Sequence, residues 1–350
     1  MSTIPSTLYA FRELLQASFT EEKSGNKILK EEENAGKSLK AYLIESHRDI
    51  FEIRIPGYSE WKRYPDSHKW FYSFDLDNNA NYFIVDTSSS RIFIFYSLID
   101  VKYADSLIEK TVKSTRGLDY CWLSRGLLES FHKLSGWYEK GIGLRYKNAL
   151  ADSDDRATLS LKAWYGSNRL MGWEKFIENA KDTVTITSIR WKKIVEGDTR
   201  ITSEWYNYGK VTITASEDID ETLLIITHMA RKYENMLVEA TKLRDGSHGA
   251  FEFNFTQKID LQAFSTAVGM GKADFNLWLT EVYSEPGFRR FRGVDMHTWD
   301  VIFFDLAEDY AYLTIPGNGC VNAAPRIATI QGEYTTGKTQ IYFNGDEIFV

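Results

Sequence analysis

The sequence predicts an α+β protein, built mostly from antiparallel sheets with packed helices and divided into two or three domains. Short segments of alternating apolar and polar residues, separated by turn signals, are typical of antiparallel strands. One long segment, residues 218–243, carries its apolar residues at helical spacing. The strands and helices do not alternate in the regular order that a parallel sheet requires, so an α/β fold is not expected.

The composition is that of a folded globular protein with a large supply of aromatic residues. Of the 350 residues, 43% are hydrophobic and 26% are charged, close to the globular average. The 10 Trp, 20 Tyr and 21 Phe residues provide large rings for a core and for contacts with partners. The formal net charge of −7 argues against a protein that coats DNA through a general positive charge.

Cysteine usage and the lack of long apolar segments bear on the compartment. Only Cys121 and Cys320 occur, so the chain has neither the paired spacing of a zinc site nor a disulfide framework. This is typical of the reducing cytoplasm. Residues 1–7 lack the charged and apolar segments of a signal peptide. No window of about 18 residues is apolar enough for a membrane span, so we expect a cytoplasmic protein without a membrane partner.

The first predicted domain covers residues 1–150 and contains a β-meander. An amphipathic helix is expected at 5–19, because Leu8, Phe11 and Leu15 fall near helical spacing. The charged segment that follows, up to residue 40, is expected to be a solvated arm or a surface helix. The remaining elements expected in this domain are strands at 51–55, 70–77, 82–85 and 91–97, and mostly helical segments at 100–114 and 119–140.

Two polar, breaker-rich stretches mark the other domain boundaries. They are Asp152–Asp155 and Arg244–Gly249, whose Asp, Ser and Gly residues favour turns. The first boundary opens a middle ββα domain, residues 151–245. The second opens a C-terminal α+β domain, residues 246–350.

The long helix of the middle domain is the clearest predicted element. Asp218 and Glu221 form a capping box at its start. Leu223, Ile226 and Leu237 belong to its apolar stripe. The other elements expected in these two domains are strands at 159–164, 184–195, 201–214 and 251–256, and helices at 170–180, 259–268 and 272–283, followed by a basic loop and further strands.

The stretch GEYTTGKT, Gly332–Thr339, matches the spelling of a phosphate loop. A phosphate loop follows a buried strand and opens directly into a helix, because the helix N-terminus faces the phosphate. Residues 326–331 are a plausible strand, but residues 340–350 contain two β-prone runs around an Asn-Gly turn instead of a helix. We therefore predict a hairpin with its tip at 334–338 and no nucleotide at Gly332–Thr339.

No complete catalytic or metal-binding motif is present in the sequence. The six histidines are dispersed, with no two within four residues of each other, whereas zinc hydrolases cluster such ligands. Asp75–Asp86 resembles a calcium loop, but Ala80 stands where the turn needs glycine. Serine-hydrolase and dinucleotide-binding glycine patterns are also absent. We assign no catalytic residue, no metal ligand and no cofactor, which favours a non-enzymatic protein and leaves catalysis an open question.

Cations and aromatic rings occur together in two places, the combination that single-stranded nucleic acid binds. If the segments 184–195 and 201–214 pair as neighbouring strands, one sheet face presents both kinds of side chain. Lysine and arginine are also common on ordinary solvated faces and edge strands, which is the alternative. The candidate nucleic-acid-binding residues are Arg190, Lys192, Tyr206, Tyr208 and Lys210 on this sheet, and Arg289, Arg290 and Arg292 in a second basic cluster.

These observations favour a non-enzymatic binding or assembly subunit of a cytoplasmic multi-protein complex. Protein partners are expected, and nucleic acid is a second class of partner. A prokaryotic antiviral complex is one setting that fits this general character. The alternative hypothesis is a metal-dependent nuclease or other hydrolase whose site is dispersed in the sequence. Such a site gathers carboxylates with a lysine or histidine in one pocket, whereas a binding subunit shows an apolar or basic surface patch.

Overall fold

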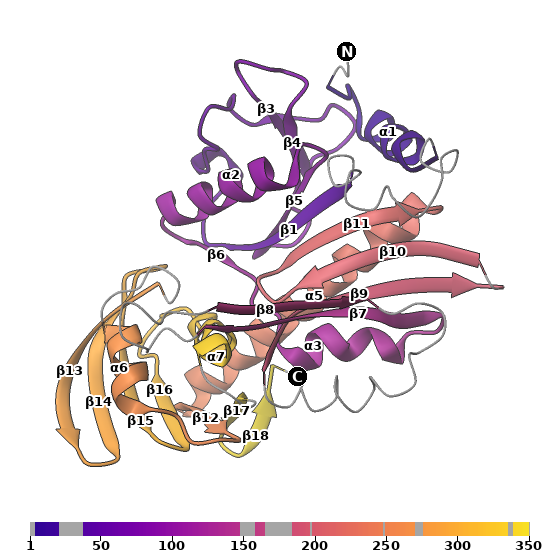
Figure 1. The fold of residues 1–350 in the computed structure, drawn as a ribbon. Helices are drawn as coiled ribbons and strands as arrows, with labels where there is room; N and C mark the ends of the chain where they lie inside the picture. The colour runs from indigo at the N-terminus through magenta and orange to yellow at the C-terminus, as the bar shows by residue number, and fades with distance from the viewer. Residues whose placement is uncertain are drawn as a thin grey trace. The chain divides into compact units, whose positions relative to one another are not determined.

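The computed structural model describes the protein at residues 4–20, 38–147, 158–164, 184–196, 198–247, 249–269, 276–334 and 339–349. Within these ranges the chain forms two antiparallel sheets, of 11 and seven strands, and six α-helices (Figure 1). The fold is therefore α+β and mostly sheet, which confirms the predicted class. No helix among these residues is long and apolar enough to cross a membrane.

The chain separates into two compact units, each built from segments that are distant in sequence. Unit 1 comprises residues 1–121, 131–139 and 190–234, and unit 2 comprises residues 122–130, 140–189 and 235–350. The three consecutive domains expected from the sequence remain a prediction.

The centre of unit 1 is strand β1 (Leu39–Ser46), which is buried along its whole length. It pairs with β5, with β11 and with the short β6. Helix α2 (Val101–Ser114) adds Leu107, Ile108 and Val112 to the core that β1 shares with its neighbours. The strands of the larger sheet, in its order, are β2 (Lys62–Arg63), β3 (Trp70–Phe74), β4 (Tyr82–Asp86), β5 (Ile92–Ser97), β1, β11 (Lys210–Ser216), β10 (Asp198–Tyr206), β9 (Thr185–Val195), β7 (Trp137–Lys147) and β8 (Thr158–Trp164), with β6 (Leu118–Tyr120) beside β1.

Strand β1 was not predicted, and the expected strand at 51–55 is wrong. Residues 50–52 form a single 3-10 turn, η3 (Ile50–Glu52), closed by a capping box between Asp49 and Glu52. The sequence signal of β1 was hidden because two of its buried residues, Lys40 and Glu45, are charged. An alternating pattern requires one polar face, and β1 has none. Helix α1 (Leu8–Thr20) forms as expected.

The mostly helical segment expected at 119–140 is also wrong. The chain there forms β6, a short helix α3 (Arg125–Glu129), a 3-10 turn η4 (Ser130–Lys133) and the start of β7. Gly136, with a φ of 79°, turns the chain into β7. The helix expected at 170–180 lies outside the described residues.

Helix α5 (Ile219–Ser247) forms where it was predicted, and the Asp218 half of the predicted capping box is present, while the Glu221 carboxylate pairs with Lys193. The Asp218 side chain accepts a hydrogen bond from the Glu221 backbone N–H at 2.9 Å. Leu223, Ile226 and Leu237 are buried, as the apolar stripe required.

The second sheet is the core of unit 2. Helix α6 (Leu261–Gly269) covers one of its faces, where Phe264 packs on Phe304 with 6.4 Å between ring centres. The strands in sheet order are β13 (Leu277–Glu285), β14 (Phe288–Asp295), β15 (Asp300–Ala307), β16 (Tyr310–Thr314), β12 (Phe251–Phe255), β17 (Thr339–Phe343) and β18 (Asp346–Ile348). The expected helix at 272–283 and the expected basic loop are therefore wrong, because β13 and β14 form a hairpin there.

The first three residues of the phosphate-loop spelling, Gly332–Tyr334, end a helix, residues 335–338 lie outside the described part of the chain, and Thr339 begins β17. Residues 323–334 form α7, so the strand expected at 326–331 is wrong and cannot be the first strand of the expected hairpin. Apart from Tyr334, the expected tip at 334–338 lies outside the described residues. Strands β17 and β18 do pair around Asn344 and Gly345. Residues 323–327 and 330–332 of α7 are all buried, so the helix has no polar face from which its periodicity could be predicted. The order is helix then strand, the reverse of a phosphate loop.

Candidate functional site

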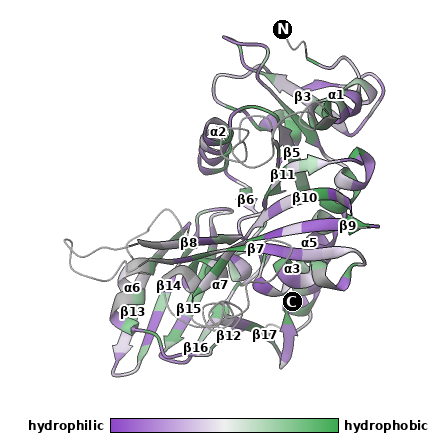
Figure 2. Ribbon diagram, turned by 45° about the vertical axis from the view of Figure 1, so that its right-hand side comes forward, coloured by the Kyte–Doolittle hydropathy of each residue, from purple (hydrophilic) through white to green (hydrophobic). Residues whose placement is uncertain are grey.

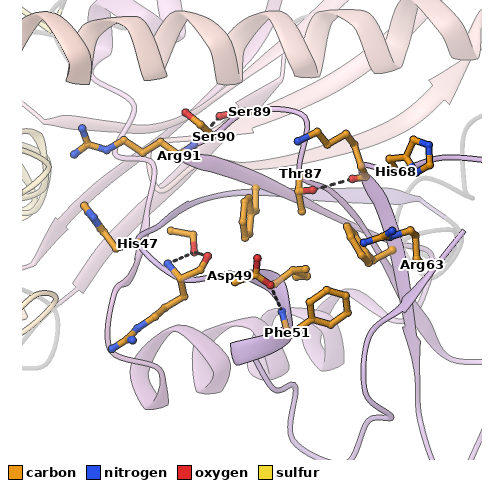
Figure 3. A pocket seen from close by; sticks show the side chains of 15 residues that line it. His47, Asp49, Phe51, Arg63, His68, Thr87, Ser89, Ser90 and Arg91 are labelled. Carbon is orange, nitrogen blue, oxygen red and sulfur yellow. Dashed lines mark hydrogen bonds between the residues drawn. The ribbon is translucent and has the colours of Figure 1, made fainter.

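A basic pocket of about 770 Å³ opens on unit 1 (Figure 3). Three segments line it: residues 46–51 after β1, residues 63–71 from β2 to β3, and residues 87–93 from the β4–β5 turn into β5. Figure 3 shows Arg63 and His68 on one side and His47 and Arg91 on the other. Its size is in the usual range of ligand pockets. Three turns around the same sheet thus converge on one hollow.

The charged side chains that line the pocket are mostly cationic. Asp49 is the only carboxylate among the lining residues, and its Oδ1 accepts the backbone N–H of Phe51 at 3.0 Å. The cations and imidazoles that line the pocket are His47, Arg48, Arg63, His68, Lys69 and Arg91. A pocket of this composition favours an anion over a metal ion.

Two of these arginines are paired with carboxylates, one of them buried and the other exposed. The guanidinium of Arg91 lies 2.6 Å from the fully buried carboxylate of Glu45, which His47 also approaches at 3.5 Å. Arg48 lies 3.1 Å from Glu52. The buried Glu45 fixes Arg91 and compensates its charge, whereas the exposed Glu52 compensates Arg48 only weakly, and Arg48 also donates to the Arg116 carbonyl at 2.9 Å.

The other two cations of the pocket form no ion pair with the described residues, although the buried Asp86 carboxylate interacts with Lys69 at longer range. Among the described residues, no carboxylate lies within ion-pair distance of Arg63 or Lys69. The Arg63 guanidinium lies over the Phe71 ring, 5.6 Å from its centre. Phe71 in turn meets the edge of Phe51 at 5.4 Å, and Phe51 is 51% exposed. The exposed ring of Phe51 therefore lies close to the Arg63 guanidinium, which forms no ion pair within the described part of the chain.

The sequence-predicted residues of the larger sheet do not form one solvated face. Arg190 and Lys192 do alternate with buried neighbours along β9. Tyr206, however, ends β10 and Lys210 begins β11, with the turn at Gly209 (φ 74°) between them. The expected continuous strand at 201–214 is thus two strands joined by a turn. Glycine favours a turn at position 209, because it adopts a positive φ without strain.

Lys210 is not a surface cation but part of a buried polar cluster. It is 3% exposed, and its Nζ lies 2.7 Å from Oδ2 of Asp105 on α2. Tyr206 lies beneath the same ammonium, with 5.1 Å from Nζ to the ring centre, and packs on Tyr208 at 5.6 Å. Tyr42 donates its hydroxyl to Oδ1 of Asp105 at 2.7 Å.

Lys40 belongs to the same region and was missed by sequence reasoning. It is fully buried, and no described residue accepts a hydrogen bond from its Nζ. Burial, and then the neighbouring Lys210 ammonium, lower the pKa of Lys40 to about 8. The signal in the sequence was a lysine inside a run that is otherwise strongly apolar, Leu39–Ile44.

The second basic cluster lies on β14 and is divided between the two faces of its sheet. Arg289 contacts Glu281 at 3.1 Å and Gln262 of α6 at 3.0 Å, on the α6-covered face. Arg290 makes a two-point contact with Asp305, at 2.8 Å for each bond. Arg292 lies over the Phe303 ring at 5.8 Å and has no ion pair within the described part of the chain.

The face of the second sheet opposite α6 is rich in exposed aromatic and aliphatic side chains. We call it the open face. Hydrophobic and hydrophilic residues alternate along its strands (Figure 2). The strand registers place Trp278, Val294 and Val301 in one row, and Thr280, Arg292 and Phe303 in the next. Its large apolar side chains are each between 37% and 61% exposed: Trp278, Val282, Tyr283, Val301, Phe303 and Tyr312.

A family model described as "MJECL33-like protein" matches residues 7–348. The match covers almost the whole chain, so this protein belongs to that family. No curated protein matches the chain.

Proposed function

We propose that this member of the MJECL33-like protein family is a binding or assembly subunit that docks another protein on its open face. The observation that carries the proposal is the contiguous set of exposed aromatic and aliphatic side chains on β13–β16. Neighbouring strands lie about 4.8 Å apart, so side chains in register form a continuous surface. Soluble proteins rarely leave such a surface uncovered unless it binds something.

The residue types of the open face are those that dominate protein interfaces. Tryptophan, tyrosine and arginine supply most binding hot spots, because they bury a large area with few rotatable bonds. Trp278 and Tyr283 lie on β13, the edge strand of the sheet that the described residues form, and each is more than half exposed. The same edge also presents unpaired backbone groups that can bind an extended segment of the partner.

The charges of the open face support a protein partner over nucleic acid. Arg290 is already neutralised by Asp305, and Glu252 lies in the same cross-strand row as both. A polyanion needs uncompensated cations, because its affinity arises from counterion release. Arg292 supplies one such cation. The partner we propose therefore has an apolar surface with a carboxylate placed to meet Arg292.

The test combines capture with direct binding. Three tagged proteins are purified from the native host: the wild type, a double variant carrying Trp278→Ala and Tyr283→Ala, and a matched control, Tyr9→Ala. The control removes an exposed tyrosine from α1 of unit 1. A protein retained by the wild type and the control but lost by the double variant is then purified and titrated by calorimetry. We expect its affinity to fall by about tenfold or more in the double variant and in Arg292→Glu.

Other outcomes contradict the proposal. Binding of an identified partner that is unchanged by both variants removes the open face as its docking site. Light scattering measures self-association. If the wild type self-associates with rising concentration and the double variant does not, the open face binds a second copy of this chain and not another protein. If labelled single-stranded RNA binds and the same substitutions abolish its binding, the open face binds nucleic acid and not a protein.

A further inference from the structure

We infer that the basic pocket of unit 1 binds a phosphorylated nucleoside, with the phosphate on Arg63 and Lys69 and the base on the ring of Phe51. This site is separate from the open face and goes beyond the proposed assembly function. It rests on three features of the pocket: two cations without an ion pair among the described residues, an exposed ring and a hydroxyl group.

The cations define the phosphate end. Arg91 is paired with the buried Glu45, and Arg48 is engaged by Glu52 and by the Arg116 carbonyl, so bringing a phosphate to either arginine competes with existing contacts. Arg63 and Lys69 face no such competition among the described residues. Arginine presents a planar fork that matches phosphate oxygens, and lysine adds a compact charge, so the two together suit a terminal phosphate.

The turn between β4 and β5 adds a hydroxyl donor. The Ser89 hydroxyl oxygen accepts the backbone N–H groups of Arg91 at 3.2 Å and of Ile92 at 2.7 Å. Since both of these bonds use its oxygen as the acceptor, the hydroxyl hydrogen is left to donate to a ligand. Ser90 is engaged differently, because its hydroxyl bonds the Glu234 carboxylate at 3.0 Å. Ser89 is therefore the hydroxyl we assign to the phosphate.

The exposed ring defines the base end. Phe51 presents half of its surface to solvent, while its contact with Phe71 holds the ring in place at an angle of 89°. Stacking of a base on an aromatic ring tolerates any base, so the site selects for phosphate and a ring and not for a particular nucleobase. Inorganic phosphate alone satisfies only the cationic half of the pocket.

The probes for the test are AMP, adenosine, inorganic phosphate and one short single-stranded RNA with either a 5′-phosphate or a 5′-hydroxyl. Binding to the full chain is measured by calorimetry at low salt. We expect AMP to bind more tightly than either phosphate or adenosine. If the 5′-phosphorylated RNA binds more tightly than AMP, the natural ligand is a strand end, and if it does not, the ligand is a free nucleotide.

Variants assign the two halves of the site. Arg63→Gln with Lys69→Gln should weaken both AMP and phosphate by about tenfold or more. Phe51→Ala should weaken AMP and leave phosphate unchanged. Arg54→Gln is the matched control, since Arg54 is exposed, pairs with Glu60 and does not line the pocket. The three altered side chains are exposed, so the fold should survive, as thermal melting will show.

Absence of AMP and RNA binding at low salt overturns the inference. Binding that neither variant changes overturns it as well, because the ligand then sits elsewhere. Either result leaves the open face untested and the assembly proposal intact.

Discussion

The Nζ atom of Lys210 lies 2.7 Å from Oδ2 of Asp105, and this pair joins strand β11 to helix α2. Lys210 is almost fully buried, whereas Asp105 is partly exposed, so the pair is open to solvent on one side only. Tyr42 donates to the other oxygen of the same carboxylate. Asp105 thus satisfies two groups that the sheet buries.

Removing this carboxylate should destabilise the protein. In Asp105→Ala, the Lys210 ammonium and the Tyr42 hydroxyl lose their partner inside the sheet–helix interface. We expect the free energy of unfolding to fall by about 1–3 kcal/mol, the usual cost of an unsatisfied buried group. Chemical denaturation measures the change. The control is Glu109→Ala on the same helix, whose surface pair with Lys113 contributes about 0.5 kcal/mol or less. Equal effects of the two substitutions would contradict the role given to Asp105.

Lys40 should make stability depend on pH in a defined window. Its pKa is about 8 in the folded protein, against an ordinary value of 10.5. Below pH 8 the lysine is charged in both states, so the folded state bears the full cost of burying the charge. Between pH 8 and 10.5 the folded protein loses this proton while the unfolded chain keeps it, and the contribution of Lys40 to the free energy of unfolding rises with pH.

Lys40→Met tests this prediction by removing the charge and keeping the volume. The variant should be more stable than the wild type at pH 7, by on the order of 3 kcal/mol. The difference between the two proteins should shrink from pH 8 to 10.5, and taking the difference removes the titration of the other lysines and of the tyrosines. Denaturation curves at several pH values provide the measurement. A less stable variant would mean that the ammonium has a partner that the described residues do not supply.

Elements with a regular pattern could be predicted from the sequence, and elements with buried polar residues could not. Helix α5 has a cap and a continuous apolar stripe, so its start and its buried face were both correct. Strand β1 contains buried Lys40 and Glu45, so it lacks an alternating pattern and was not predicted, and its first two residues were assigned to the charged segment before it. The hairpin of β13 and β14 was missed because Trp278, Val282 and Tyr283 are exposed. Predicting strands and helices from the apolar pattern assumes that apolar side chains are buried, and that assumption fails for a sheet face with exposed aromatic residues.

The candidate sites show the same limit. The basic pocket is assembled from three turns spread over residues 46–93, and no short motif records their convergence. The basic cluster Arg289–Arg292 could be seen in the sequence, but its division between two sheet faces and its ion pairs could not. Side-chain partners that are distant in sequence decide whether a cation is available for a ligand.

The buried face of α5 gives a direct test of the fold. Leu223 is 6% exposed, whereas its neighbour Leu224 is 66% exposed. Leu223→Ala should lower the free energy of unfolding by about 2–5 kcal/mol, as expected for a large-to-small change in a core. Leu224→Ala, which makes the same chemical change on the exposed side, should alter it by less than about 0.5 kcal/mol. Guanidinium denaturation of both variants is the measurement, and equal losses would show that the helix is rotated from the orientation described.

The glycines of the GEYTTGKT stretch should matter for packing and not for nucleotide binding. Gly332 lies in α7, and a Cβ atom at this position would run into the Thr185 hydroxyl. Gly332→Ala should therefore destabilise the protein, by about 1–3 kcal/mol for a crowded site, and Thr185→Ala should restore part of the loss by removing the obstructing atoms.

Lys338→Ala should leave the melting temperature unchanged. ATP should raise the melting temperature of neither the wild type nor Lys338→Ala. If ATP raised the melting temperature of the wild type but not that of Lys338→Ala, the stretch would be a phosphate loop after all. A phosphate-binding lysine contacts the nucleotide directly, whereas Gly332 acts only through its contact with Thr185.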